Sequence, residues 1–121
     1  MTVVITPTDT EAEQLAADIR FFYGGLEAAS DAAIEEAVLH LPALQVDPYR
    51  GMTPHFRVSA ARARALHGAI SGSARIIVAS AAAMLPRMSS PERMLEASIE
   101  LRAGSEIEPL DCSSTTPFHV P

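Results

Sequence analysis

The sequence predicts an all-α domain of about four helices packed around a long, alanine-rich central helix over residues 59–84. Two observations lead to this prediction. Apolar residues recur at alternating spacings of three and four, which is typical of amphipathic helices, and helix-start signals precede these stretches. The chain has 121 residues, 48% apolar and 20% charged, and fits one globular domain. We therefore expect a single helical domain over residues 1–121, with an extended arm at 1–8 and an irregular tail at 105–121.

The first helix is expected to begin at Thr8. Thr8 and Glu11 form a capping-box pattern, in which the side chains at positions N-cap and N3 each bond the other residue's backbone. An apolar stripe follows at helical spacing: Ala12, Leu15, Ile19, Phe22 and Leu26. The β-branched run over residues 2–5 precedes the helix and indicates either a small edge strand or an extended arm.

The second helix is expected to begin at Ser30 or Asp31, both of which are good capping residues. We expect it to end before Pro42, because the residue before a proline avoids helical geometry. Its apolar face would consist of Ile34, Val38 and Leu41. A long connection that contains several prolines follows over residues 42–56 and is expected to run across the surface.

The central helix is expected over residues 59–84 because no proline interrupts this stretch. One face carries a row of small residues, which would let another backbone approach closely: Ala61, Ala65, Gly68, Gly72, Ala79 and Ala83. The two interior glycines cost about 2 kcal/mol relative to alanine. We therefore keep the alternative that residues 68–73 form a turn and residues 74–80 a buried strand.

A fourth helix is expected to begin within residues 89–92, where a serine cap is followed by Pro91 and Glu92. The tail beyond it keeps apolar residues, among them Phe118 and Val120. We expect this tail to be held by the chain's own body or by another subunit.

Charge is sorted along the chain into three blocks. Residues 1–47 carry nine acids and one base, residues 48–91 carry six arginines and no acid, and residues 92–121 carry six acids and two bases. We expect protein carboxylates, from this chain or a neighbouring copy, to neutralise the basic block. Nucleic acid is not the expected partner, because the net charge is −6 and the acidic flanks would repel a phosphate backbone.

The sequence carries no motif for catalysis, a metal or a cofactor. The glycine spacings match neither a phosphate loop nor a dinucleotide fingerprint, and the four histidines lack zinc-site spacing. One anion site is a candidate, with Arg64, His67, Ser71 and Arg75 at successive helical turns. Guanidinium groups bind phosphate or carboxylate through paired hydrogen bonds. Ion pairs with acids of neighbouring helices are the simpler interpretation of these arginines.

These observations favour a non-catalytic structural or adaptor protein that acts through protein–protein contacts. It would be a subunit of a homo-oligomer or of a larger assembly, such as a virion head or neck. The candidate interface residues are the small-residue row and two tail residues: Ala61, Ala65, Gly68, Gly72, Ala79, Ala83, Phe118 and Val120. The first alternative is an acidic inhibitor or immunity-type protein that covers a basic site on a target. The second is a small helical anion-binding protein or enzyme that uses His67, Arg64 and Arg75.

The composition indicates a cytoplasmic or other intracellular protein. A single cysteine suits a reducing compartment. The amino terminus lacks the basic region of a secretory signal, and the longest uncharged run is too short to cross a bilayer. We therefore expect a protein partner and no cofactor, and we do not expect a membrane, nucleic acid or small molecule as partner.

Overall fold

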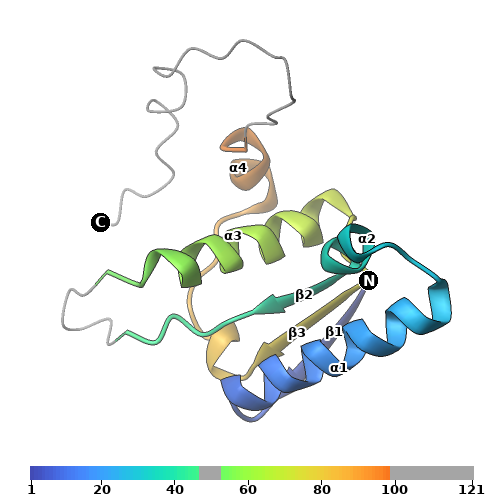
Figure 1. Cartoon of the computed structure of the whole chain (residues 1–121). Helices are drawn as coiled ribbons and strands as arrows, with labels where there is room; N and C mark the ends of the chain where they lie inside the picture. Colours follow the sequence, from blue (N-terminus) through green and yellow to red (C-terminus); the bar gives the residue numbers. More distant parts are fainter. Residues whose placement is uncertain (47–52, 99–121) are drawn as a thin grey trace. The chain divides into compact units, whose positions relative to one another are not determined.

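The computed structural model describes residues 1–46 and 53–98 (Figure 1). It contains a three-stranded parallel sheet together with helices. The fold is therefore mixed α/β, and the prediction of an all-α domain is wrong. The chain divides into two compact units, Met1–Arg87 and Met88–Pro121.

The first unit alternates strands and helices along the chain. Its elements are β1 (Thr2–Thr6), α1 (Asp9–Glu27), α2 (Asp31–Ala37), β2 (Val38–Leu41), α3 (Phe56–Ser71), β3 (Ile76–Ser80) and a 3₁₀ turn, η2 (Ala82–Met84). The strands lie in the order β1-β3-β2 and all pairs are parallel. The last strand in sequence is therefore the central strand of the sheet.

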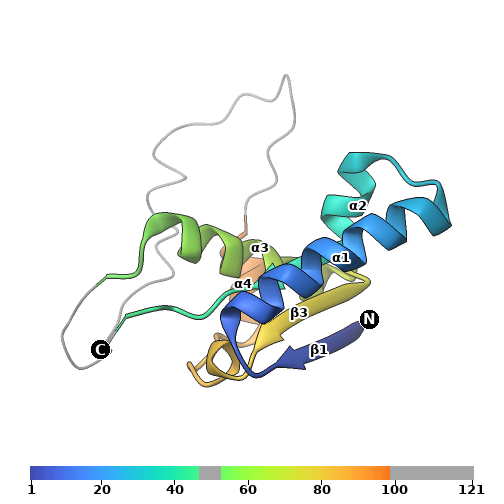
Figure 2. The same ribbon diagram turned by 60° about the horizontal axis from the view of Figure 1, so that its bottom comes forward.

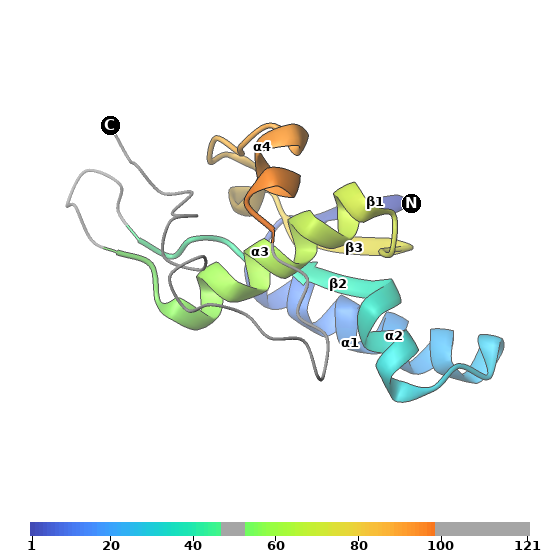
Figure 3. The same cartoon turned by 90° about the horizontal axis from the view of Figure 1, so that it is seen from above.

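Helices α1 and α3 cover opposite faces of this sheet. Side chains alternate between the two faces of a strand. Val78 of β3 packs with Ala12 and Ala16 of α1, while its neighbours Ile77 and Ala79 belong to the core that includes Ala65 of α3. Figure 2 shows α1 crossing the sheet, and Figure 3 shows α3 running beside β2.

The predicted central helix over residues 59–84 is wrong in its second half. Helix α3 ends at Ser71, Gly72 follows with a positive φ of 79°, and β3 occupies Ile76–Ser80. A strand covered on both faces is apolar throughout, so hydrophobic periodicity does not distinguish it from a buried helix. The alternative of a turn over residues 68–73 and a buried strand over 74–80 is confirmed for the strand, but the turn is shorter than expected because residues 68–71 still belong to α3.

The second predicted helix is wrong at its carboxyl end for the same reason. Helix α2 ends at Ala37, and residues Val38–Leu41 form strand β2 instead of a further helical turn. Val38, Leu39 and Leu41 are all buried. Such a short apolar run satisfies the helical spacing of Ile34, Val38 and Leu41 by coincidence.

Three of the predicted helix starts are confirmed, whereas the central helix begins earlier than residue 59: α3 starts at Phe56, and the His55 side chain caps it. Thr8 and Glu11 form the capping box of α1, and the Ser30 side chain caps α2. The β-branched run at the amino terminus forms the edge strand β1. In the second unit, Ser90 caps α4 (Pro91–Glu96). Within the described ranges, no helix has the length and apolar character needed to cross a bilayer.

Candidate functional site

The carboxyl end of the sheet is the first place to search for a functional site, because open parallel sheets bind ligands beyond the carboxyl ends of their strands. Four polar residues meet there, and we name them the carboxyl-end cluster: Asp9, His40, Arg62 and Ser80. Asp9 begins α1, His40 lies in β2, Arg62 in α3, and Ser80 ends β3.

Asp9 is the centre of this cluster. Its Oδ1 accepts hydrogen bonds from the Ala43 backbone N–H and the Ser80 hydroxyl, both at 2.9 Å, and Oδ2 accepts from Gln45 Nε2 at 3.4 Å. Burial alone would raise the pKa of Asp9, but these hydrogen bonds and the nearby His40 outweigh it and hold the pKa below 3.8. The ionised carboxylate therefore joins α1 to the segments that follow β2 and β3.

His40 lies against Asp9 without bonding to it. Its Nε2 is 4.0 Å from Asp9 Oδ1, is buried and has no hydrogen-bond partner. Burial lowers the pKa of His40 below 6.5, while the charges of Asp9 and Glu13 oppose this shift only in part. The imidazole is therefore neutral at pH 7.

Serine, histidine and aspartate meet in this cluster, yet their bonds differ from those of a hydrolytic triad. In a triad the serine hydroxyl donates to the histidine, which the aspartate orients. Here the Ser80 hydroxyl donates to Asp9 and accepts from the Ala83 N–H, and Ser80 is fully buried. Ser80 thus lacks the histidine base and the access to substrate that the serine of a triad has.

Arg62 closes the other side of this end of the sheet. Its side chain is buried, and Nη1 donates to the carbonyl oxygens of Pro42 at 2.7 Å and Ala83 at 3.0 Å. Burial lowers the pKa of Arg62, and the Asp9 charge partly offsets this effect. The guanidinium group therefore binds backbone that follows β2 and β3 through its Nη1.

The carboxyl-end cluster was not predicted from the sequence. Its signal was present, because Thr6 and Ser80 are polar residues at the ends of apolar runs and Asp9 lies just beyond the first run. Recognising that signal requires knowing that residues 76–80 form a strand parallel to β1, and that stretch was assigned to the central helix.

The predicted anion site is divided between two segments. Arg64, His67 and Ser71 lie in α3, but Arg75 follows the helix and directly precedes β3. Arg64 Nη2 donates to the Glu35 carbonyl at 3.0 Å and lies 3.7 Å from the Glu35 carboxylate. Arg64 therefore contacts α2. Whether the four residues bind an anion stays a prediction.

Four of the predicted interface residues lie inside the first unit: Ala65, Gly68, Ala79 and Ala83 are buried. The close approach that Gly68 permits is made to the chain's own sheet, because a Cβ there would lie 2.5 Å from Leu39 Cδ1. Ala61 is half-buried in α3, and Gly72 is exposed at its end. Phe118 and Val120 lie outside the described residues.

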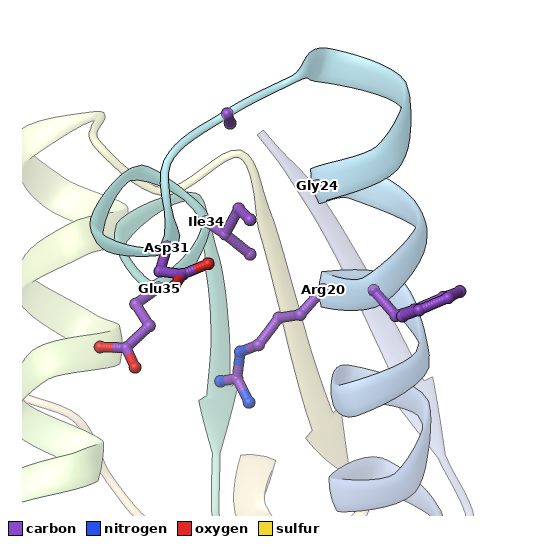
Figure 4. A pocket seen from close by; sticks show the side chains of 7 residues that line it. Arg20, Gly24, Asp31, Ile34 and Glu35 are labelled. Atoms are coloured by element: carbon purple, nitrogen blue, oxygen red, sulfur yellow. The ribbon is translucent and has the colours of Figure 1, made fainter.

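A shallow groove of about 520 Å³ lies between the second half of α1 and helix α2. Figure 4 shows Arg20 on one wall and Ile34, Asp31 and Glu35 on the other. The remaining lining residues are Phe21, Gly24 and Ala29. Arg20 Nε donates to the Val38 carbonyl at 3.1 Å, so this guanidinium also binds backbone. The groove therefore contains the Arg20 guanidinium, which is bonded to backbone, and the carboxylates of Asp31 and Glu35.

The end of α1 beside this groove exposes large apolar side chains. Phe21, Phe22 and Leu26 are 77%, 63% and 84% exposed. These side chains are exposed because α1 is longer than the strands that it covers. The 19 residues of α1 span about 28 Å at 1.5 Å per residue, whereas the five-residue strands span about 17 Å. The last turns of α1 therefore extend past the sheet, as Figure 2 shows.

Comparison with models of known protein families, with curated protein sequences and with solved structures gives no significant match. Among the residues that the structure describes, no three His, Cys, Asp or Glu side chains converge where they could hold a metal ion.

Proposed function

We propose that this protein is a non-catalytic structural or adaptor protein that acts inside the cell through protein–protein contacts in a larger assembly. The observation that carries the proposal is the apolar end of α1, which consists of Phe21, Phe22 and Leu26. We name these three residues the α1 apolar end.

Exposure of the α1 apolar end to water is unfavourable in free energy. Full burial of a leucine or phenylalanine side chain contributes about 1.5–3 kcal/mol, and these three residues forgo most of that contribution. Phe21 and Phe22 lie edge to face with ring centroids 5.5 Å apart. A rigid aromatic pair at the end of a helix loses little entropy when it enters a partner's pocket.

The charges around this surface indicate the chemistry of the partner. Asp18, Glu27, Asp31 and Glu35 are all exposed on α1 and α2 near the α1 apolar end. An apolar patch with an acidic rim is complementary to an apolar pocket with a basic rim. This chemistry is shared by the adaptor and by the inhibitor alternative, and in both cases the chain acts by binding a protein.

The carboxyl-end cluster supports the non-catalytic part of the proposal. Its aspartate and serine are engaged by hydrogen bonds within the chain, and Arg62 Nη1 donates to two backbone carbonyls. General acid–base or nucleophilic catalysis needs such groups to reach a substrate, and Ser80 is fully buried.

Site-specific photo-crosslinking in the native cells tests the proposal. A photoreactive phenylalanine analogue in place of Phe22 should give a discrete protein adduct, and Leu26→Ser should reduce its yield at least several-fold. The matched control places the analogue at Ala17, an exposed position on the same helix, where no adduct is expected. No adduct at position 22, or the same adducts at both positions, would contradict the proposal.

A further inference from the structure

The free edge of strand β1 is a second surface with no partner in the first unit, and it is independent of the α1 apolar end. β1 lies at one end of the strand order and pairs only with β3 within the described residues. Val3 and Ile5 are 45% and 57% exposed, although both are β-branched residues in the middle of a parallel sheet's edge strand. Parallel sheets normally have both faces covered.

The two faces of β1 differ in how they are covered. Val4 opposes Val78 and packs into the core beneath α1. Val3 and Ile5 oppose Ile77 and Ala79, whose side chains face α3. Helix α3 packs mainly on β2, and among the described residues it has at most marginal contact with β1. The exposed side chains of β1 are therefore on the α3 side.

The backbone of β1 has a defined set of unpaired groups at its outer edge. The Thr2 N–H donates to the Arg75 carbonyl, and the Ala81 N–H donates to the Thr6 carbonyl. In a parallel ladder alternate residues bond the same neighbour, so Thr2, Val4 and Thr6 face β3. The N–H and C=O groups of Val3 and Ile5 therefore point outward.

We infer that β1 pairs antiparallel with β1 of a second copy of this chain, about a two-fold axis at Val4. In this register Val3 of one copy lies opposite Ile5 of the other. Both are residues whose backbone groups point outward, so each pair exchanges two hydrogen bonds, as the closely bonded pairs of an antiparallel ladder do. All four outward groups of each β1 are then satisfied, and the two sheets become one sheet of six strands.

The same register suits the side chains and the charges. Directly opposed residues of antiparallel strands share a face, so Val3 and Ile5 of both copies form one apolar cluster on the α3 side. Residues 2–8 carry no charged side chain.

Helix α1 does not obstruct this pairing. Its buried face packs on Val78 of β3, not on the outer side of β1. Three strand spacings of about 4.8 Å would separate β3 from the partner's β3, which is about 14 Å. Packed helices need only about 8–10 Å between their axes, so the two α1 helices fit side by side.

Sedimentation equilibrium of the full chain over a hundredfold range of concentration tests the dimer. We expect a monomer–dimer equilibrium that Ile5→Lys weakens at least tenfold, because a charge on an edge strand opposes pairing. The matched control is Leu26→Lys, which adds the same charge at an exposed leucine of the α1 apolar end and should leave the dimer unchanged. A chain that stays monomeric throughout, or a dimer that Leu26→Lys abolishes and Ile5→Lys does not, would overturn the inference.

A disulfide tests the register. Val4→Cys in a Cys112→Ser background places two thiols opposite each other across the axis, where Cα atoms of a non-bonded antiparallel pair are about 4.5 Å apart, within the range of disulfides. Mild oxidation should give a covalent dimer for Val4→Cys and none for Ala17→Cys. Absence of the Val4→Cys dimer overturns the register. Val3 and Ile5 amides that are protected from hydrogen exchange in a monomer would show that the chain itself covers this edge, which also overturns the inference.

Discussion

Three arginines of the first unit, Arg20, Arg62 and Arg64, bind backbone carbonyl oxygens more closely than they bind carboxylates. Arg20 donates to Val38, Arg62 to Pro42 and Ala83, and Arg64 to Glu35. The carboxylate contact of Arg64 is 3.7 Å long between mostly exposed side chains, and such pairs contribute little. The sorting of charge in the sequence predicted ion pairs for the basic block, but residue type alone does not reveal that a guanidinium will satisfy the end of a strand.

The hydrogen bonds of Asp9 predict how its substitution changes the free energy of unfolding. Asp9→Ala leaves the Ser80 hydroxyl and the Ala43 N–H without their acceptor, and should lower the free energy of unfolding by about 2–4 kcal/mol. Asp9→Asn keeps one acceptor oxygen and should cost less. Urea denaturation followed by circular dichroism measures both. Asp18→Asn, an exposed position on the same helix, should change stability by no more than about 0.5 kcal/mol.

The pKa of Asp9 sets the pH window of this effect. Because its folded pKa lies below 3.8, the stability that ionised Asp9 contributes is complete above pH 3.8 and is lost as the pH falls through the folded pKa. The advantage of the wild type over Asp9→Asn should therefore be constant above about pH 5 and shrink toward pH 3. An advantage that grows on acidification would contradict the carboxylate's role.

His40 gives a second, separable pH effect. Its folded pKa lies below 6.5, so the unfolded chain binds a proton first as the pH falls through 6.5. Stability is then lost by up to about 1.4 kcal/mol per pH unit for each proton. His40→Leu removes no hydrogen bond of Nε2 and should flatten stability between pH 7 and pH 5. The exposed His67→Leu is the control, and equal flattening by both variants would rule out His40 as the source.

At the scale of elements, three of the four helix starts were predictable, whereas the arrangement of the strands in a parallel sheet was not. Thr8, Ser30 and Ser90 cap helices as expected, because capping depends on residues adjacent in sequence. Strands β2 and β3 depend on pairing between residues more than 30 positions apart, which local periodicity does not report. The carboxyl-end cluster was missed in consequence, since its members meet only when the strands are parallel neighbours.

Two glycines test how helices fit the sheet. A Cβ at Gly68 would lie 2.5 Å from Leu39 Cδ1 and 3.3 Å from the Ala74 Cβ, and Leu39 is buried. Gly68→Ala should therefore destabilise the fold by about 1–3 kcal/mol through overpacking. Gly25→Ala, in open space on α1, should stabilise it by up to about 1 kcal/mol through helix propensity. Urea denaturation compares the two, and similar effects from both would show that α3 does not lie this close to β2.

At the scale of the whole molecule, the core that the described residues form belongs to the first unit. Both clusters of buried apolar residues lie within residues 12–83, inside the unit that ends at Arg87. A small domain of this length can bury enough surface to fold alone. The sheet also depends on its last strand, because β1 and β2 do not pair with each other but each pair with β3. β1 and β2 can therefore belong to one sheet only when residues 76–80 lie between them as β3.

Truncation separates these two requirements. Residues 1–87 alone should unfold cooperatively in urea with the circular dichroism of a mixed α/β protein, because they contain both core clusters and all three strands. Residues 1–71, which keep α1 and α3 but lack β3, should show no cooperative transition, since β1 and β2 then have no strand to pair with. If residues 1–71 unfolded as cooperatively as residues 1–87, the helices would form the stable core without the sheet. If residues 1–87 failed to fold, the core would extend beyond Arg87.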